Sequence, residues 1–319
     1  MIVAAGESLV DVAVLESERG RLLLEAVPGG SPWNTALALG RLGAPAGFLG
    51  PIASDPFGLL LRDGLDAAGV KVLLEATSPR PTALAITERN EGGDVAYRFH
   101  RTGTADRDLD LAALAAALPH SVAIYHTGSL ALADEPEGET WTDLALAAAE
   151  RGALLSLDPN IRPGTIQEPG RYRDRIGILL DRTAIVRLSE EDLAYVVEAG
   201  DLAAARALFF GRHGCSLVAL TCGARGAVLM TDGAEAWVDA HRPASLADTI
   251  GAGDTFTAAM LARIRALGCR TDLRSLSAEA LAGIGRYASA AAGLTCGRAG
   301  CDPPTAADVA TALGAAEAL

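Results

Sequence analysis

The stretch DTIGAGDTFTAAM, residues 248–260, leads from small residues through an aspartate into an apolar, helix-like pattern. Gly251, Ala252 and Gly253 have little or no side chain, so an anionic ligand can approach their backbone N–H groups closely. The helix that follows adds the positive end of its dipole at the same point. The segment therefore predicts an anion-binding cradle at a helix N-terminus.

Asp254 stands at the mouth of this predicted helix. We expect the N–H donors there to keep its carboxylate ionised, and therefore able to accept a proton. The simplest alternative is that Asp254 only caps the helix and that the glycines only form a tight turn. Taken alone, the segment leaves both interpretations open.

Outside this segment, short apolar runs alternate with longer helical patterns rich in alanine and leucine. The strand-like runs are residues 2–6, 46–53, 122–128, 153–160, 183–189 and 216–223, and the helix-like ones are 31–43, 57–69, 140–152 and 190–200. This order is typical of βαβ units, and it predicts a three-layer α/β/α sandwich with a mainly parallel central sheet. Ligands of such sheets bind beyond the carboxyl ends of the strands.

Two stretches break the alternation. Residues 12–27 and 82–101 each look like a pair of strands around a polar turn, at residues 17–20 and 90–93. Together they predict a small β-sheet that projects as a lid. Because no shift in composition marks a linker, we expect residues 1–319 to form a single α/β domain with this lid inserted in it.

Charge and composition exclude several classes of function. The chain has 27 basic and 40 acidic residues and a net charge of −13, which disfavours nucleic acids and anionic membranes as partners. Its Ala-rich stretches fall well short of the roughly 20 apolar residues that span a bilayer, and its first residues lack the basic region of a secretion signal. The five cysteines form no CxxC pair and no regular framework. We therefore expect a cytoplasmic protein.

Lysine is nearly absent, since Lys71 is the only one in the chain. This excludes a P-loop of the GxxxxGK[ST] type and the strand lysine of protein kinases. A dinucleotide-binding GxGxxG fingerprint is also disfavoured, because it would need glycine where Phe256 stands. If phosphate binds near Gly251, backbone N–H groups, arginine and metal must hold it.

DTIGAGDTF resembles the C-terminal DTxGAGD signature of the PfkB (ribokinase-like) carbohydrate kinases, and PGGSPWNTALALGRLGAPAGFLGPIASDPFG, residues 28–58, resembles their N-terminal signature. The resemblance extends over most of the chain and implies a ribokinase-like fold. It further implies that Asp254 is the catalytic base for a sugar hydroxyl that attacks the γ-phosphoryl group of ATP. Gly251, Ala252 and Gly253 would stabilise the charge on the transferred group.

The same resemblance implies a set of sugar-binding residues near the N-terminus: Asp11, Gly29, Gly30 and Asn34. Taken singly, Asp11 is equally well a solvated residue at a strand end. The two glycines and the asparagine are equally well a turn followed by an amide in the first turn of a helix.

Two further segments carry a resemblance: residues 158–163 resemble a segment that fructokinases and 2-keto-3-deoxygluconate kinases both have, and residues 97–106 resemble the lid-to-core segment of fructokinases. In DPNIRP, residues 158–163, Arg162 is a candidate partner of a substrate oxygen or a phosphate, and its alternative is a buried salt bridge to Asp158. In YRFHRTGTAD, residues 97–106, Arg101 is a candidate to reach the substrate and Phe99 a candidate apolar wall. The alternative for Arg101 is a surface arginine on an edge strand.

For ATP, LTCGARGA, residues 220–227, resembles the T-x-G-x-x-G turn of the family. This implies nucleotide contacts by Thr221, Gly223 and Gly226, with Arg225 as an additional cation. Without the resemblance the segment is an ordinary hairpin turn.

Other positions depart from the family pattern or concern metal ions. Ser189 and Asp192 stand where the family usually has Asn-x-x-Glu, and Asp192 can still hold a water of Mg²⁺. Ser289 replaces an asparagine that lies near adenine in many relatives. Asp248, with carbonyls near Ile250, is a candidate ligand of a monovalent cation such as K⁺.

Together these motifs predict an ATP- and Mg²⁺-dependent sugar kinase of the fructokinase-like branch. A 2-keto-3-deoxygluconate kinase or another PfkB sugar kinase is the alternative, because a keto acid would suit two converging arginines, Arg101 and Arg162. From a different class, a catalytically silent sugar-binding regulator also remains open. Exposed strand edges in the lid predict a homodimer that forms through the lid.

Overall fold

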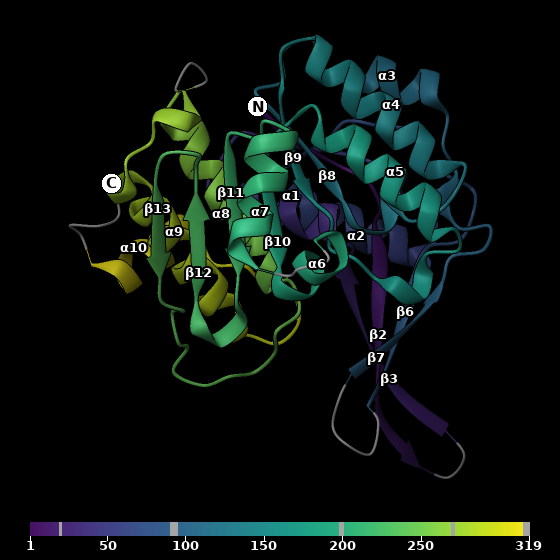
Figure 1. Cartoon of the computed structure of the whole chain (residues 1–319). Helices are drawn as coiled ribbons and strands as arrows, with labels where there is room; N and C mark the ends of the chain where they lie inside the picture. The colour runs from purple at the N-terminus through teal and green to yellow at the C-terminus, as the bar shows by residue number, and fades with distance from the viewer. Residues whose placement is uncertain (19–20, 90–94, 198–200, 269–271, 315–319) are drawn as a thin grey trace.

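The computed structural model describes residues 1–18, 21–89, 95–197, 201–268 and 272–314 (Figure 1). Within this part of the chain a nine-stranded sheet has the strand order β13-β12-β11-β10-β9-β8-β1-β4-β5. The strands are β1 (Ile2–Ala5), β4 (Ala46–Leu49), β5 (Lys71–Val72), β8 (Ile124–Gly128), β9 (Leu154–Asp158), β10 (Thr183–Ser189), β11 (Leu217–Thr221), β12 (Ala227–Met230) and β13 (Glu235–Val238). All neighbouring strands pair in parallel except at β12, which is antiparallel to β11 and β13.

Strand β1 shows why the predicted strands are continuously apolar. Ile2 and Ala4 belong to one hydrophobic core, Val3 and Ala5 belong to a second core on the opposite face, and none of the four is exposed. A strand that is covered on both faces cannot alternate between apolar and polar residues.

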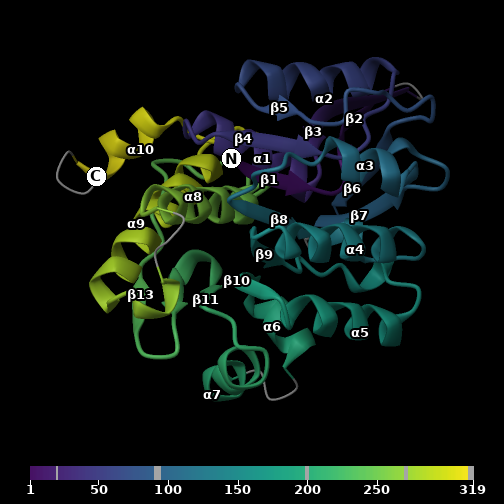
Figure 2. The same ribbon diagram turned by 90° about the horizontal axis from the view of Figure 1, so that it is seen from above.

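Helices cover both faces of the sheet, as Figure 2 shows. Those packed on the first core are α1 (Ser31–Arg41), α2 (Pro56–Ala67), α8 (Ala252–Ala266), α9 (Ala278–Cys296) and α10 (Ala306–Leu313). Those packed on the second are α3 (Leu111–Ala117), α4 (Glu137–Glu150), α5 (Pro169–Leu180), α6 (Glu190–Val196) and α7 (Leu202–Arg206). The predicted three-layer α/β/α sandwich is confirmed.

A second sheet of four strands projects away from the sandwich (Figure 1). It consists of β2 (Leu9–Glu18), β3 (Arg21–Gly29), β6 (Ala83–Arg89) and β7 (Val95–His100), in the order β3-β2-β6-β7. The small lid sheet is thus confirmed. Its first hairpin starts earlier and ends later than predicted, because Leu9 pairs with Gly29 at the base of the lid. The two predicted turns include residues 19–20 and 90–93, which lie outside the described residues.

The carboxyl ends of the parallel strands meet at the edge of the sheet from which the lid extends. Asp158 ends β9, Ser189 ends β10 and Thr221 ends β11. The N-terminal ends of α1 and α8 lie at the same edge, and these two helices pack against each other. This convergence brings the two family-like motifs together.

Two other expectations concern the environment of the protein. Where the chain is described, no helix is both long and apolar enough to cross a membrane. Cys215, Cys222, Cys296 and Cys301 are free thiols, and Cys269 lies outside the described residues.

Candidate active site

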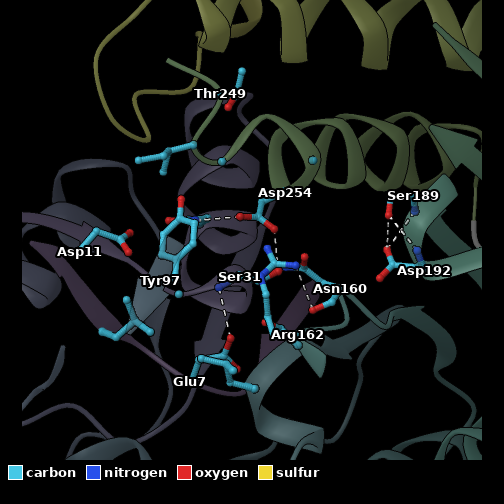
Figure 3. Close-up of a pocket in the computed structure, with 18 of the residues that line it drawn as sticks. Glu7, Asp11, Ser31, Tyr97, Asn160, Arg162, Ser189, Asp192, Thr249 and Asp254 are labelled. Atoms are coloured by element: carbon cyan, nitrogen blue, oxygen red, sulfur yellow. Dashed lines mark hydrogen bonds between the residues drawn. The ribbon is translucent and has the colours of Figure 1, made fainter. Parts of the chain in front are cut away.

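A cavity of about 310 Å³ lies between the lid, the strand ends and the start of α8 (Figure 3). The lid contributes Asp11 and Tyr97, the segment after β9 contributes Arg162, and α8 contributes Asp254. Charged and polar side chains from distant parts of the sequence thus surround one space.

Asp254 is held by two side chains of α1. Ser31 Oγ donates a hydrogen bond to Asp254 Oδ1 over 2.6 Å, and Asn34 Nδ2 donates one to Oδ2 over 2.7 Å. The residue that caps α8 is Gly251, with φ of 73°, and Asp254 follows it in the first turn. The interpretation of Asp254 as a simple helix cap is therefore wrong.

Burial raises the pKa of Asp254 above its ordinary value, although the hydrogen bonds from Ser31 and Asn34 and the charges of Arg187 and Arg162 act in the opposite direction. We expected backbone donors at the helix mouth to keep this carboxylate ionised. The structure corrects that expectation, since side chains of α1, Ser31 and Asn34, donate to the carboxylate and desolvation dominates. A carboxylate with a raised pKa is a better proton acceptor once it is ionised.

The glycines of the predicted cradle are needed for steric reasons. Gly251 has a left-handed φ, and a Cβ atom there would collide with Sγ of Cys301. A Cβ atom on Gly253 would lie 2.9 Å from Nη2 of Arg187. Gly251 and Gly253 border the cavity that contains Asp254, whereas Ala252 borders a second cavity on the other side of the helix start.

Asp11 lies inside lid strand β2 and not at the end of a strand, which corrects the alternative of a solvated strand end. Burial, together with the nearby charges of Asp254 and Asp248, raises its pKa to about 7, while Arg162 acts to lower it. Gly29 makes room for this carboxylate, because a Cβ atom at position 29 would collide with Oδ2 of Asp11.

Gly30, Asn34 and Phe99 also border the cavity that contains Asp254. Gly30 has φ of 101° and caps α1, and Asn34 stands in the first turn of that helix. Gly30 therefore forms the turn, and Asn34 the amide in the first turn of a helix, that the alternative interpretation described. Asn34 also donates a hydrogen bond to Asp254. Their roles in sugar binding stay predictions.

Arg162 borders the same cavity and donates a hydrogen bond to the carbonyl oxygen of Ile161 over 3.2 Å. The partner of Asp158 is Arg187, with 3.1 Å between Nη1 and Oδ2. The alternative of a salt bridge between Arg162 and Asp158 is therefore wrong.

Arg101 is buried, so the alternative of a surface arginine is also wrong. Its Nε lies 2.7 Å from Oδ2 of Asp106, and Nη2 donates to the carbonyl oxygen of Leu130 over 3.3 Å. It does not border the cavity that contains Asp254. It shares an adjacent cavity of about 630 Å³ with Phe99 and Arg162.

A second cavity, of about 330 Å³, lies on the other side of the start of α8. Thr221, Gly223, Gly226 and Ser289 border it, together with mainly apolar residues of α8 and α9. The segment LTCGARGA connects the antiparallel strands β11 and β12, so it is a hairpin turn and also a wall of this cavity.

Ser289 fixes the neighbouring wall of the second cavity. Its hydroxyl donates to the carbonyl oxygen of Asp239 over 2.8 Å and accepts from the backbone N–H of His241 over 2.9 Å. Arg225 points elsewhere: it is exposed, forms an ion pair with Glu190 and is not among the residues that border the second cavity.

Ser189 and Asp192 form a capping box at the start of α6. Asp192 accepts hydrogen bonds from the backbone N–H groups of Ile161 over 2.6 Å and Ser189 over 2.9 Å. Both residues border the cavity that contains Asp254, not the second one where Ser289 lies. Within the described residues, no three His, Cys, Asp or Glu side chains group into a metal site.

Asp248 organises the loop before α8. Its Oδ1 accepts from the backbone N–H groups of Thr249 over 2.6 Å and Ile250 over 3.0 Å, and its Oδ2 accepts from that of Gly300 over 3.2 Å. Its role as a cation ligand stays a prediction.

Sequence reasoning missed several residues that border the cavity of Asp254: Glu7, Ser31, Tyr97, Arg187 and Glu191. Glu7 is buried and accepts from the backbone N–H groups of Ser31 over 3.3 Å and Ala131 over 3.0 Å, which anchors the start of α1. Arg187 had a detectable signal, because it is a charged residue within the otherwise apolar run TAIVRLS.

A buried carboxylate at a glycine-lined helix start, with a cavity on each side, suits a small-molecule phosphotransferase. Residues 3–308 match the model of the pfkB family carbohydrate kinases, so the chain belongs to this family and is a sugar kinase. The predicted recognition, fold and enzyme class are thereby confirmed.

Named relatives are similar over most of the chain. A fructokinase from Rhizobium leguminosarum bv. trifolii is 36% identical, covering 88% of this chain and 85% of the relative, and one from Klebsiella pneumoniae is 34% identical, covering 86% and 87%. The crystal structure of a fructokinase with bound ATP from Xylella fastidiosa superposes with a TM-score of 0.84 at 26% identity, covering 98% of this chain and 97% of the other.

Proposed function

We propose that this enzyme is a fructokinase that transfers the γ-phosphoryl group of ATP to a hydroxyl group of fructose. The observation that carries the proposal is the position of Asp254. Its carboxylate is held by Ser31 and Asn34 at the start of α8 and borders the polar cavity, and the mainly apolar cavity lies on the other side of the helix start. The names of the relatives support fructose as the acceptor.

In the reaction, the sugar lies in the polar cavity and one of its hydroxyl oxygens attacks the γ-phosphorus. The new O–P bond forms as the bond to the β-phosphate oxygen breaks, and ADP leaves with that electron pair. Asp254 takes the hydroxyl proton. The backbone N–H groups of Gly251, Ala252 and Gly253 meet the charge on the transferred group.

The second cavity suits the adenosine part of ATP, because small residues and an apolar wall accept a flat base. Mg²⁺ bound with the nucleotide would supply charge neutralisation on the phosphates. Asp192 fits a contact through water better than direct ligation, since both of its oxygens already accept hydrogen bonds. For a monovalent cation such as K⁺, Asp248 is the residue we propose.

The surroundings of Arg101 favour a neutral sugar over a keto acid. A substrate carboxylate would need a free cationic partner, but Asp106 compensates the charge of Arg101 at 2.7 Å. Of the two candidate arginines, Arg162 would then be left to face that carboxylate, with the carboxylate of Asp11 bordering the same cavity. We therefore place 2-keto-3-deoxygluconate second to fructose.

For assembly and location, we propose a homodimer that forms through the lid, a cytoplasmic enzyme, and residues 1–319 as a single domain. Large apolar side chains that are exposed on β2 and β3 support the dimer: Val14, Leu15, Leu22, Leu23 and Leu24. Free thiols in the described residues fit a reducing compartment.

The test is release of ADP from Mg²⁺ and ATP in the presence of fructose, 2-keto-3-deoxygluconate, ribose, glucose or adenosine. We expect turnover to be fastest with fructose. Fastest turnover on another sugar would overturn the choice of substrate. Sugar binding without any sugar-dependent ADP release would support the silent regulator.

A further inference from the structure

Arg187 lies at the boundary between the two cavities. It is on β10 and its side chain faces α8, because Ile185 of the same strand packs in the core beneath that helix. Among the described residues, Arg187, Thr249 and Gly253 are the three that border both cavities, and Arg187 alone of these is charged. Whatever passes from one cavity to the other therefore passes this guanidinium group.

The guanidinium group is buried and held, yet it keeps donors free. The whole residue is 8% exposed. Nη1 lies 3.1 Å from Oδ2 of Asp158, and Nη2 donates to Oγ1 of Thr221 over 2.6 Å. Nε has no hydrogen-bond partner among the described residues. Because Nε is buried, the donors left to a ligand are those that Nη1 and Nη2 carry beyond these contacts.

The free side of Arg187 faces the anion cradle. A Cβ atom built on Gly253 would lie 2.9 Å from Nη2 and 3.0 Å from Nη1, so the two nitrogens lie against the first turn of α8. The backbone N–H groups of that turn and the guanidinium group therefore border the same small space. Two kinds of donor directed at one point suit an anion with several oxygens.

The negative charges that border the cavity of Asp254 require a positive side chain there if a triphosphate is to bind. Asp11, Asp192 and Asp254 border the cavity into which a triphosphate must reach. The single lysine, Lys71, lies far away on edge strand β5. In the described part of the chain, Arg162 and Arg187 are the basic residues that border this cavity, and Arg187 is the one that also borders the second cavity.

We propose that Arg187 binds the phosphoryl group while it moves from ATP to the sugar. The inference rests on the proposed function. As the sugar oxygen bonds to phosphorus and the bond to ADP breaks, Arg187 donates hydrogen bonds to non-bridging oxygens of the transferred group, while Asp254 receives the hydroxyl proton. Asp158 and Thr221 keep the guanidinium group in place, so Arg187 is a catalytic residue and Asp158 a positioning residue.

The test compares Arg187→Gln with Arg182→Gln, a matched change at an exposed arginine just before the same strand. We expect Arg187→Gln to lower kcat by roughly 10²–10³ and the control to leave it unchanged. Affinity for fructose and ADP, measured by calorimetry, should stay within about threefold of wild type, because neither ligand carries the transferred group. In Arg187→Gln, the ratio of the affinity for ATP to the affinity for ADP should be smaller than in wild type, because only ATP carries the transferred group. In Arg187→Ala, added guanidinium should restore part of the turnover.

A purely structural role predicts a different pattern: weaker binding of ADP and fructose alike, a lower Tm and no rescue by guanidinium. That pattern, or a folded Arg187→Gln enzyme with kcat within about threefold of wild type, would overturn the inference.

The role of Arg187 can still be tested if Arg187→Gln does not fold, or if wild type has no turnover. If Arg187→Gln does not fold, Arg187→Lys keeps a positive charge beside Asp158 but loses the forked donor group, and we expect it to fold and to lose at least about tenfold in kcat. Wild-type turnover from folded Arg187→Lys would overturn the inference. If wild type itself has no turnover, the proposed function fails. The contact between Arg187 and the phosphoryl group is then still tested by binding, because the preference for ATP over ADP can be compared between wild type and Arg187→Gln.

Discussion

The two cavities on either side of the start of α8 are built in different ways. The cavity of Asp254 is walled by charged and polar side chains from the lid, α1 and the strand ends. The second cavity is walled mainly by hairpin glycines and by small or apolar residues of α8 and α9, with Arg187, His241 and Arg242 also on its border. The first is suited to select and activate a polar acceptor by hydrogen bonds, whereas the second is suited to accept a flat group by shape. Substitutions on the two sides should therefore affect different kinetic constants.

The strongest test of this comparison is Asp254→Asn. The change keeps size and a hydrogen-bonding head group but removes the proton acceptor, so kcat should fall by roughly 10²–10⁴ while fructose binding is largely kept. Steady-state kinetics and calorimetry measure the two effects. Asp143→Asn, on the exposed surface of α4, is the control for the chemical change. Near wild-type kcat in Asp254→Asn would refute its role as the base.

Filling the second cavity should act on ATP alone. Ala292 borders this cavity, and Ala292→Phe should raise KM for ATP by about tenfold or more while KM for fructose stays unchanged. Ala307→Phe places the same ring on the exposed surface of α10 and should change neither constant. Equal increases in both KM values would show that the cavities are not separate in function.

Removing one donor to the base should shift the pH profile. The hydrogen bond from Ser31 lowers the pKa of Asp254, so Ser31→Ala should raise that pKa further. As the proposed base, Asp254 acts when it is deprotonated, and the acidic limb of kcat/KM should therefore move to higher pH, by about one pH unit. Ser275→Ala, at an exposed serine, should leave the limb in place. A limb that moves to lower pH would contradict the geometry at Asp254.

The smallest effect concerns the stability cost of the polar cavity. The pKa of Asp11 is raised to about 7 from 3.8, so folding disfavours its charged form, and this cost grows as the pH rises from 3.8 to 7. Asp11→Asn removes the charge. The gain in the free energy of unfolding over wild type should be about 2 kcal/mol larger at pH 8 than at pH 5, in urea titrations. Asp143→Asn should show no such difference, and a gain that shrinks with pH would mean that Asp11 is not desolvated.

Much of the fold was predictable because it depends on near neighbours in the sequence. The alternation of strand and helix patterns predicted the sandwich, and the two unusual hairpins predicted the lid. The end of the first hairpin was misjudged, because the pairing of Leu9 with Gly29 depends on the base of the lid and not on any local turn signal.

The candidate site was predictable in its motifs but not in its contacts. Gly251 and Asp254 were singled out correctly as parts of one helix start, whereas the partners of Asp254 were not. Arg101 and Arg162 looked alike in the sequence. The structure separates them, because Asp106 pairs with Arg101 while Arg162 borders the cavity of Asp254.

The sequence by itself determined the family, the layer order and the glycine-rich turn before α8, because signature motifs, hydrophobic periodicity and small residues are properties of short segments. Only the tertiary structure decided which charges are compensated. Asp254 meets Ser31 and Asn34 across 223 and 220 positions of the chain, and Arg187 meets Asp158 across 29. Such pairs depend on how strands and helices pack, and burial then raises the pKa of Asp11 and of Asp254.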